Sequence, residues 1–325
     1  MRHVSVSPAG SPANLAVVDA PDQPPGEDEV AVAVAAAGIN RADLLQRAGH
    51  YPPPPGASDV LGLEVSGTVV DVGPGVSGWA PGDQVCALLD GGGYADRALV
   101  PAAQLLPVPD GVPLADAAAL PEAVCTAWSN LAGVAHLAAG EWLLVHGGSG
   151  GVGTVAVQIG AALGAHVVAT AGGPDRVERC RALGAELGVD HREQDFVEVV
   201  REASGGHGAD VVLDVVGAAY LADNVRVLAT GGRLVVIGMQ QGRRGELDLG
   251  ALVARRASVT GTTLRSRPAA EKAAVVAAVR EHVWPMLADG RVRPVVHARL
   301  PLAEAAAAHE LLDSGDVFGK VLLVP

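Results

Sequence analysis

The chain changes its hydrophobic pattern near residue 113. Before this point, short apolar or alternating runs are broken by glycine and proline, which is typical of strands joined by tight turns. The expected strands lie at residues 15–18, 29–37, 63–72 and 84–88. Many short strands of this kind predict a compact, barrel-like β domain in the first part of the chain.

Beyond residue 113, helical and strand patterns take turns. Helices are expected at residues 113–120 and 124–131, and strands then alternate with helices up to residue 262. Continuous apolar runs, such as residues 234–237, predict strands that are buried on both faces of a parallel sheet. Strand and helix in this alternation predict a doubly wound parallel-sheet α/β domain.

The last sixty residues leave this rhythm. Residues 271–287 are expected to form one long helix, followed by a strand, a helix and a strand at residues 295–300, 303–312 and 320–324. We expect this tail to return to the first domain. Residues 1–122 and 266–325 then form one discontinuous domain, and residues 123–265 form a nucleotide-binding domain. The cleft between two domains is the default ligand site.

Composition supports a folded protein of two domains. The chain has 325 residues, of which 49% are hydrophobic and 18% charged, as in globular proteins. The net charge of −13 argues against nucleic acid as a partner. Only two of the 23 basic residues are lysines, Lys272 and Lys320.

Neither cysteine usage nor hydropathy indicates secretion or a membrane span. The spacing of Cys86, Cys125 and Cys180 excludes a disulfide framework and a paired-cysteine metal site. No secretory signal is visible at the first residues, so we expect a cytoplasmic protein. Residues 142–174 contain no charged side chain, but their many glycines favour a buried β-turn-α-β unit over a membrane span.

The most informative motif is the glycine-rich turn at residues 146–153. Gly148, Gly150 and Gly153 fit the pattern G-x-G-x-x-G between an apolar strand and a helix. Glycines let the backbone approach a pyrophosphate, which then binds the free N–H groups of the helix N-terminus. A Walker phosphate loop would need a lysine after the glycines, and this segment has none. The motif therefore predicts a dinucleotide cofactor.

The end of the second strand favours NADPH over NADH. NAD-specific folds carry an acidic residue here, which binds the ribose 2′-hydroxyl. In this chain the strand runs into Ala171, Gly172 and Gly173, which leave room for a phosphate, and Arg176 is its expected bidentate partner. Asp175 is the alternative ribose ligand, although a carboxylate also suits the first turn of the next helix.

Two N-terminal segments, with the glycine turn after them, resemble the medium-chain dehydrogenase/reductase superfamily over essentially the whole chain. They read Gly-Ile-Asn-Arg-Ala-Asp at residues 38–43 and Leu-Gly-Leu-Glu-Val-Ser-Gly at residues 61–67. In the zinc alcohol dehydrogenases of that superfamily, the first segment carries a cysteine ligand and the second reads Gly-His-Glu. Here Asn40 and Leu63 stand at the ligand positions, so we expect no metal.

The zinc-free branch that remains resembles the NADPH:quinone oxidoreductases of the zeta-crystallin type. The shared pattern includes Asn-Arg-Ala-Asp-Leu at residues 40–44 and Tyr-Pro-Pro-Pro-Pro-Gly-Ala-Ser at residues 51–58. The resemblance implies a Rossmann cofactor domain joined to a GroES-like β-barrel catalytic domain. It also implies that Asn40 and Tyr51 are catalytic residues beside the nicotinamide and the acceptor.

The other expected site residues contact the cofactor. Ser149, Gly150, Gly151 and Val152, together with Gly148, would cradle the pyrophosphate, and Gly172, Gly173 and Arg176 would hold the 2′-phosphate. His191 would lie near the adenosine phosphate, and Lys320, after Phe318, near the cofactor phosphates. The nicotinamide would contact Gly238, Met239, Gln240, Thr262, Thr263 and Leu264. Thr126 and Gly217 are further expected cofactor contacts.

Simpler interpretations of these residues stay open. Tyr51 could be a tyrosine packed on a polyproline-like loop, Asn40 a helix cap and His191 a surface histidine. We interpret Asp43 and Glu64 as structural carboxylates, because hydride transfer to a quinone needs no protein base.

The expected function is NADPH-dependent, metal-free transfer of hydride to a quinone or another small conjugated carbonyl compound. An enoyl or alkenal reductase is the alternative, and an NADPH-binding regulatory or structural protein is the alternative of another class. The resemblance also implies a homodimer, for which residues 258–262 could supply the Rossmann sheet edge.

Overall fold

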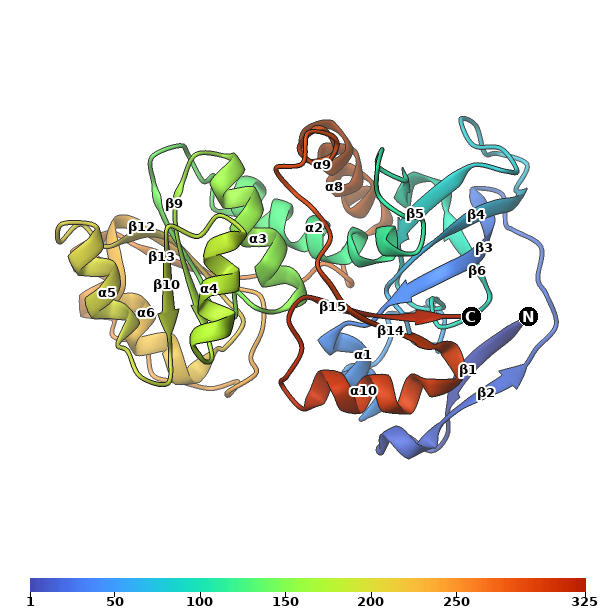
Figure 1. Cartoon of the computed structure of the whole chain (residues 1–325), viewed down its shortest axis with the longest axis horizontal. Helices are drawn as coiled ribbons and strands as arrows, with labels where there is room; N and C mark the ends of the chain where they lie inside the picture. Colours follow the sequence, from blue (N-terminus) through green and yellow to red (C-terminus); the bar gives the residue numbers. More distant parts are fainter. The chain divides into compact units, whose positions relative to one another are not determined.

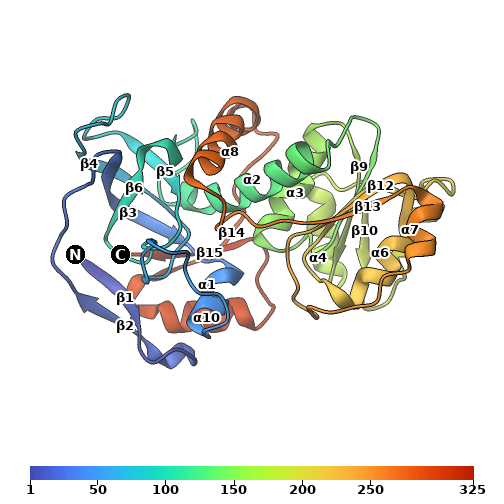
Figure 2. The same cartoon turned by 180° about the vertical axis from the view of Figure 1, so that it is seen from behind.

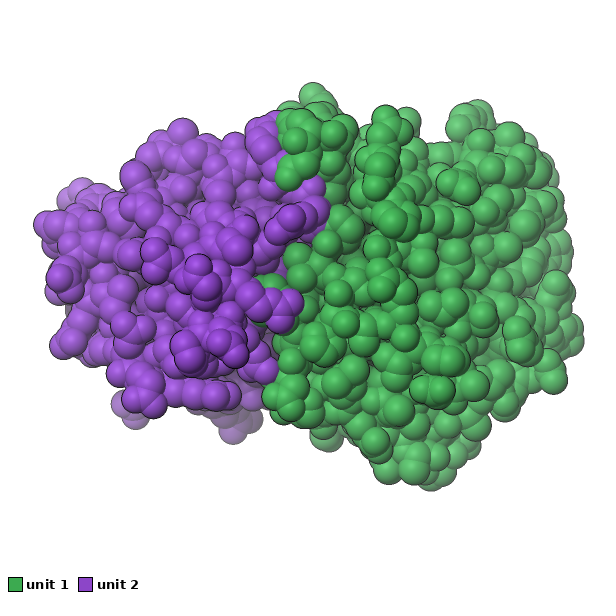
Figure 3. Space-filling model, in the orientation of Figure 1, with its two compact units in different colours: residues 1–125, 264–290, 294–325 green, residues 126–263, 291–293 purple.

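Apart from a two-stranded hairpin, the strands of the chain pair into two large sheets that have no strand in common. The computed structural model describes residues 1–325, and its two units are coloured separately in Figure 3. Each large sheet belongs to a different unit. Unit 1 comprises Met1–Cys125, Leu264–Gly290 and Pro294–Pro325, and unit 2 comprises Thr126–Thr263 and Arg291–Arg293. The domain boundaries expected from the sequence stay a prediction, because compactness alone does not show which segments fold by themselves.

Unit 2 is built on a six-stranded sheet in which every neighbouring pair is parallel. The strands are, in spatial order, β10 (Leu187–Asp190), β9 (His166–Ala171), β8 (Trp142–Val145), β11 (Ala209–Asp214), β12 (Leu228–Val236) and β13 (Ser258–Gly261). The order along the chain reverses between β8 and β11, which is the switch point of a doubly wound sheet. β13 forms one edge of this sheet, as Figure 2 shows.

The buried strands are apolar throughout because successive side chains point to opposite faces of the sheet, and helices cover both faces. Leu144 packs in one core with Val168 and with Phe196 of α5. Its neighbour Leu143 faces α3, because a Cβ atom at Gly160 of α3 would lie 2.6 Å from Leu143 Cδ2. The helices of this unit are α3 (Gly151–Ala162), α4 (Pro174–Ala182), α5 (Phe196–Ala203), α6 (Leu221–Val227) and α7 (Leu249–Arg255).

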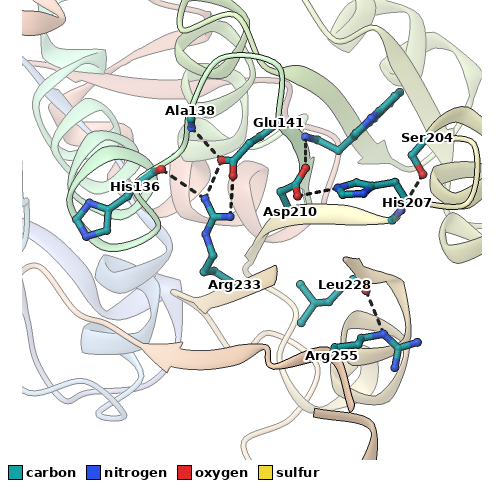
Figure 4. A network of polar contacts seen from close by, with 11 residues as sticks. His136, Ala138, Glu141, Ser204, His207, Asp210, Leu228, Arg233 and Arg255 are labelled. Atoms are coloured by element: carbon teal, nitrogen blue, oxygen red, sulfur yellow. Dashed lines mark hydrogen bonds and ion pairs between the residues drawn. The ribbon is translucent and has the colours of Figure 1, made fainter. Parts of the chain in front are cut away.

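A polar network ties together the amino ends of the central strands (Figure 4). Arg233 donates to both carboxylate oxygens of Glu141, at 2.9 and 2.7 Å. Asp210 accepts hydrogen bonds from the Trp142 backbone and from the His207 ring, both at 2.8 Å. Burial acts to raise the pKa of the Glu141 carboxyl, but the hydrogen bonds from Arg233 and the backbone outweigh it and lower this pKa. The opposite, carboxyl edge of the sheet is the one that carries the glycine turn.

Unit 1 contains a seven-stranded mixed sheet. Its strands are β14 (Val296–Pro301), β15 (Lys320–Val324), β3 (Glu29–Gly38), β4 (Glu64–Val72), β5 (Gln84–Leu88) and β7 (Leu105–Pro107), with β6 (Arg97–Pro101) paired to β3. Only β14 and β15 pair in parallel. A separate hairpin is formed by β1 (Arg2–Val6) and β2 (Leu15–Asp19).

The helices of unit 1 pack around this sheet. They are α1 (Arg41–Arg47), α8 (Ala269–His282), α9 (Trp284–Ala288) and α10 (Ala305–Asp313), and α2 (Pro121–Trp128) starts in this unit. α10 packs on β15 and on the β1–β2 hairpin (Figures 1 and 2). The tail of the chain thus places two strands and three helices in the same unit as the first 125 residues.

Two helix predictions are wrong, in both cases at proline. The single helix expected over residues 271–287 is divided into α8 and α9, because Pro285 has no N–H and its ring clashes with the preceding turn. Residues 113–120 contain only the short 3₁₀ turn Asp116–Ala119, and α2 starts at Pro121. No helix of the chain is both long and apolar enough to span a membrane.

Candidate functional site

The carboxyl edge of the parallel sheet gathers most of the residues expected to bind the cofactor. Because all six strands run in one direction, the segments that follow them lie along the same edge. Residues 148–152 follow β8, Gly172 and Gly173 follow β9, His191 follows β10, Gly217 follows β11, residues 238–240 follow β12, and Thr262 follows β13. Ligands of open α/β sheets bind at this edge, beside the switch point.

The glycine turn is in direct contact with the first turn of α3. Gly147 has a φ of 66°, which favours glycine. A Cβ atom at Gly153 would lie only 2.0 Å from the Gly147 carbonyl oxygen. α3 begins at Gly151 and has no acidic residue in its first turn. The positive end of its dipole and its first N–H groups therefore suit an anion such as a pyrophosphate.

The loops after β9 and β10 form a second cluster, which includes two residues that the sequence reasoning missed. Gly173 has a φ of 90°, and its N–H donates to Asp190 Oδ1 at 3.1 Å. The Arg192 guanidinium lies against Gly172, because a Cβ atom at Gly172 would be 3.1 Å from its Nε and Nη2 atoms. Hydrogen bonds from the Gly173 and Arg192 backbones lower the pKa of the Asp190 carboxyl. The available signal was the Asp-His-Arg run at the end of the strand that became β10.

The first turn of α4 contains Asp175. This position agrees with the interpretation of Asp175 as a carboxylate that interacts favourably with the helix dipole. Arg176 comes next on the same helix. The contact of Arg176 with a 2′-phosphate, and the alternative contact of Asp175 with a ribose hydroxyl, stay predictions.

His146, at the end of β8, is a buried structural histidine. Its Nε2 lies 2.7 Å from Asn224 Oδ1, and its Nδ1 lies 3.1 Å from Thr170 Oγ1. Burial lowers the pKa of His146 to about 4, so the ring is neutral at pH 7. It links the glycine turn to β9 and α6 through hydrogen bonds.

A buried cluster surrounds Asn40 in unit 1. The Lys320 ammonium donates to Asn40 Oδ1 at 2.6 Å and to the Ile39 carbonyl at 3.0 Å, and it lies 2.5 Å from Glu64 Oε1. Asn40 Nδ2 donates to the same Glu64 oxygen at 3.0 Å. These contacts fix which end of the Asn40 amide is the donor. Lys320 is thus in contact with three oxygens of unit 1. The resemblance implied that it lies near the cofactor phosphates, and this stays a prediction.

These groups are poor zinc ligands. Zinc in proteins is held by thiolate, imidazole and carboxylate groups. At the two positions that the resemblance associates with metal ligands, the chain has the amide of Asn40 and the hydrocarbon side chain of Leu63. The carboxylate beside them, Glu64, is fully buried and is paired with the ammonium of Lys320. A positive charge is thus already supplied by the chain itself.

Asp43 anchors the start of α1. Its two oxygens accept from the Asn40 N–H at 2.8 Å and from the Gly62 N–H at 3.0 Å. Burial raises the pKa of Asp43 to about 6, although these two hydrogen bonds act to lower it. This geometry agrees with the interpretation of Asp43 as a structural carboxylate.

Tyr51 lies beside a small pocket of unit 1. The guanidinium carbon of Arg265 is 5.4 Å from the centre of the Tyr51 ring, a cation–π distance. Arg265 also lines a pocket of about 10 Å³, which has room for about one water molecule. The remaining lining residues are Leu63, Leu88, Leu89, Asp90, Glu122, Leu264 and Lys272. Leu264, which was expected beside the nicotinamide, therefore lines this pocket.

The sequence reasoning did not identify Asp90, Arg265 or Lys272. A usable signal was the scarcity of lysine. Both lysines of the chain are buried, since Lys272 is 4% and Lys320 is 3% exposed. Lysine is almost never buried without a partner, so two rare lysines in apolar contexts could have indicated two buried polar sites.

Two family models match the chain, one on each half. The family described as "Alcohol dehydrogenase GroES-like domain" matches residues 26–110, and the family described as "Zinc-binding dehydrogenase" matches residues 151–280. The quinone oxidoreductase of Rattus norvegicus is 32% identical over 332 residues, which covers 100% of this chain and 98% of that protein.

Solved structures agree with this assignment. The chain resembles the Escherichia coli quinone oxidoreductase complexed with NADPH, with a TM-score of 0.88 and 29% identity over 100% of both chains. It also resembles CurK enoyl reductase, with a TM-score of 0.87 and 27% identity over 99% of this chain and 98% of that one.

The chain also matches a part of much longer proteins. It is 36% identical over 305 residues to the mycocerosic acid synthase-like polyketide synthase of Mycobacterium tuberculosis. The match covers 92% of this chain but only 14% of that relative.

The predicted fold class is confirmed by the parallel sheet of unit 2 and by the GroES-like match to unit 1. The near-complete alignment with a quinone oxidoreductase covers both units. The chain belongs to the medium-chain dehydrogenase/reductase superfamily, in its zinc-free, quinone oxidoreductase-like branch.

Proposed function

We propose that this protein is an NADPH-dependent, metal-free reductase of quinones. The observation that carries the proposal is the Asn40 amide, which Lys320 and Glu64 hold at a position where zinc-dependent members of the superfamily have a cysteine ligand. Bound NADPH would supply a hydride from its nicotinamide. The chain's own residues would then bind the two reactants, orient them and exclude water.

The cofactor preference follows from charge at the carboxyl edge of unit 2. β9 ends at Ala171 without a carboxylate, and Gly172 and Gly173 carry no side chain that would exclude a 2′-phosphate. The nearby Asp190 carboxylate accepts from the Gly173 N–H. Arg176 and Arg192 are the cations available to it, and Arg192 already lies against Gly172. The Escherichia coli relative, which is complexed with NADPH, supports the same choice.

Asn40 and Tyr51 would position the acceptor. One Nδ2 hydrogen of Asn40 bonds to Glu64, and the second would donate to a carbonyl oxygen of the acceptor. Because Lys320 bonds to Oδ1, the amide cannot turn over and lose this donor. The Tyr51 ring would form a flat wall for a planar acceptor. Protons would come from solvent, so no protein base is needed.

The resemblance to CurK enoyl reductase favours a second candidate, reduction of a conjugated carbon–carbon double bond in an enal, enone or acyl thioester. The same contacts would serve it, because hydride addition to such a bond also places negative charge on a carbonyl oxygen. A third candidate, of another class, is a protein that binds NADPH and turns over little.

A steady-state screen separates these candidates. Purified protein is mixed with NADPH or NADH and with 1,4-benzoquinone, trans-2-hexenal or crotonyl-coenzyme A, and nucleotide oxidation is followed. Quinone reduction with NADPH supports the proposal. Turnover of the enal or thioester alone supports the second candidate, and tight NADPH binding without any turnover supports the third.

Asn40→Ala tests the assigned role. We expect kcat to fall about 10²-fold, as for the loss of one donor to a developing oxyanion, with NADPH affinity retained. Asn14→Ala is the matched control, because Asn14 is half-buried and its side-chain amide donates to the Pro8 carbonyl. Equal activity of the Asn40→Ala variant and the control would refute the role.

A further inference from the structure

A buried amide side chain connects two segments of unit 2 that are distant in sequence. Asn130 is 3% exposed and lies in the π-helical turn Ser129–Val134, which follows α2. Its Nδ2 donates to the Thr126 carbonyl oxygen at 2.8 Å. Thr262, directly after β13, donates from its Oγ1 to Asn130 Oδ1 at 2.6 Å. Asn130 thus fixes the hydroxyl of a residue that lies 132 positions further along the chain.

The contacts of Asn130 determine the direction of each hydrogen bond. If its Nδ2 and Oδ1 exchanged places, an oxygen would face the Thr126 carbonyl oxygen, and the two acceptors would repel each other. Oδ1 therefore faces Thr262, and because Oδ1 carries no hydrogen, the Thr262 hydroxyl is the donor. A hydroxyl has one hydrogen and two lone pairs. Since the hydrogen is bonded to Asn130, Thr262 Oγ1 can act toward a ligand only as an acceptor.

The Thr262 hydroxyl lies at the ligand-binding edge of the parallel sheet. The Thr262 N–H donates to the carbonyl oxygen of Val236, the last residue of β12, at 3.1 Å. Thr262 is therefore fixed beside the carboxyl ends of β12 and β13, where ligands of open α/β sheets bind. Its side chain is half-buried, so a ligand can reach the remaining lone pairs of Oγ1. A ligand group that binds here must bring a hydrogen-bond donor.

The strand order indicates which part of the cofactor lies near Thr262. The spatial order is β10, β9, β8, β11, β12 and β13, and the glycine turn follows β8 at the switch point. The proposed 2′-phosphate site, with Gly172 and Arg192, follows β9 and β10 on one side of that turn. Because the 2′-phosphate belongs to the adenosine half, the nicotinamide half extends toward β11, β12 and β13. The only N–H group of that half is the primary amide of the nicotinamide.

We infer that Asn130 is a positioning residue, which holds Thr262 Oγ1 as the acceptor for an N–H of the nicotinamide amide. The inference rests on the proposed function and adds the group that recognises the nicotinamide ring. An acceptor of fixed polarity favours the amide over a substituent that has no N–H. A hydrogen bond to the amide also opposes rotation of the ring about its bond to the ribose, so one face of the ring stays directed toward the acceptor of the hydride.

A nucleotide analogue without the amide tests this contact without turnover. In 3-acetylpyridine adenine dinucleotide phosphate, a methyl group replaces the NH₂ group of the NADP⁺ amide, and the rest of the molecule is the same. Dissociation constants of both nucleotides are measured by isothermal titration calorimetry. We expect the wild-type protein to bind NADP⁺ about tenfold more tightly than the analogue, because the analogue leaves the Thr262 acceptor unpaired.

Four variants assign the preference for NADP⁺ to the two residues. Thr262→Val has the same shape without the hydroxyl, so it should bind NADP⁺ about tenfold more weakly and the analogue as wild type does. Thr262→Ser keeps the hydroxyl and should keep most of the preference. Asn130→Leu releases the hydroxyl hydrogen and should reduce the preference although Thr262 is intact. Thr230→Val changes an exposed threonine of β12 and is the matched control, which should behave as wild type.

The analogue distinguishes an amide contact from a structural role. Equal affinity of the wild type for the two nucleotides would overturn the contact. Equal weakening of both nucleotides by Thr262→Val would also overturn it, because a bond to a ribose hydroxyl or a packing role does not depend on the amide. An Asn130→Leu protein with the full wild-type preference would refute the role of Asn130. Asn130→Ala takes its place in the comparison if the larger side chain prevents folding.

The proposed function and the amide contact can fail separately. A protein that shows the expected preference for NADP⁺ but reduces no quinone with NADPH would refute the proposed function and leave the amide contact standing. A protein that reduces quinones with NADPH but binds NADP⁺ and the analogue equally would refute the amide contact alone.

Discussion

Replacing Gly153 by alanine measures how closely α3 lies against the glycine turn. The new Cβ would lie 2.0 Å from the Gly147 carbonyl oxygen, whereas ordinary contact starts at 3.4 Å, so 3.4 − 2.0 = 1.4 Å of movement is needed. The opposing atom is backbone, which cannot rotate away. Overpacking against immovable backbone lies at the upper end of the usual range, about 3 kcal/mol, and the better helix propensity of alanine returns about 1 kcal/mol. We therefore expect a net loss of stability of up to about 2 kcal/mol.

Two other glycines of the same segment provide a graded control. A Cβ at Gly150 would have its nearest contact at 3.4 Å, and one at Gly160 would meet the movable side chain of Leu143 at 2.6 Å. Thermal unfolding should therefore rank Gly150→Ala as least and Gly153→Ala as most destabilised. NADPH titration should show the largest loss of affinity for Gly153→Ala, because the helix N-terminus must shift. A Gly153→Ala protein with the melting temperature and NADPH affinity of wild type would refute the close contact.

Three further predictions concern charged and titratable groups. Arg192→Gln and Arg176→Gln should each weaken NADPH binding about tenfold or more and leave NADH binding unchanged, as measured by fluorescence titration; equal losses for both nucleotides would argue against a 2′-phosphate contact. The pKa of His146 is about 4 in the folded protein and 6.5 in the unfolded chain. The contribution of the neutral ring to stability is therefore complete above pH 6.5, and up to about 3 kcal/mol of it is lost as the pH falls toward 4. His146→Gln should reduce this pH dependence of the free energy of unfolding. Lys320→Met should destabilise by about 3–5 kcal/mol because it leaves the Glu64 carboxylate buried and unpaired, and adding Glu64→Gln should recover much of the loss in chemical denaturation.

Local patterns in the sequence were enough to predict the nucleotide-binding half of the molecule. A strand, a glycine turn and a helix are neighbours along the chain, so their spacing is visible in some twenty residues. The parallel sheet follows because continuous apolar runs need cover on both faces. Local patterns gave a wrong prediction where a single residue ends a helix within a periodic stretch. Pro285 does this within the helix expected over residues 271–287.

The polar groups of unit 1 were out of reach for that reasoning because their partners are distant in sequence. Lys320 meets Asn40 across 280 residues, and Arg265 meets Gln46 across 219. Periodicity reports which side of an element is buried, but it does not report which buried charge will meet which acceptor. Lys320 was assigned toward the cofactor phosphates from the resemblance, whereas its contacts place it among acceptors of unit 1.

The buried Lys320–Glu64 pair explains how a zinc-free member of the superfamily can keep the buried carboxylate of Glu64 without a metal ion. Glu64 is fully buried, so its charge needs a cation within contact distance. An ammonium meets that need with hydrogen bonds, and unlike a metal ion it has no open coordination position with which to polarise a substrate oxygen. Its third contact, to Asn40 Oδ1, fixes the orientation of the amide, whose Nδ2 donates to Glu64 Oε1. Under the proposed function, activation of an acceptor depends on fixed hydrogen-bond donors such as Asn40. Such donors can stabilise an oxygen that gains charge as hydride arrives, but they cannot hold an alkoxide as a metal does, and this favours conjugated acceptors over simple alcohols.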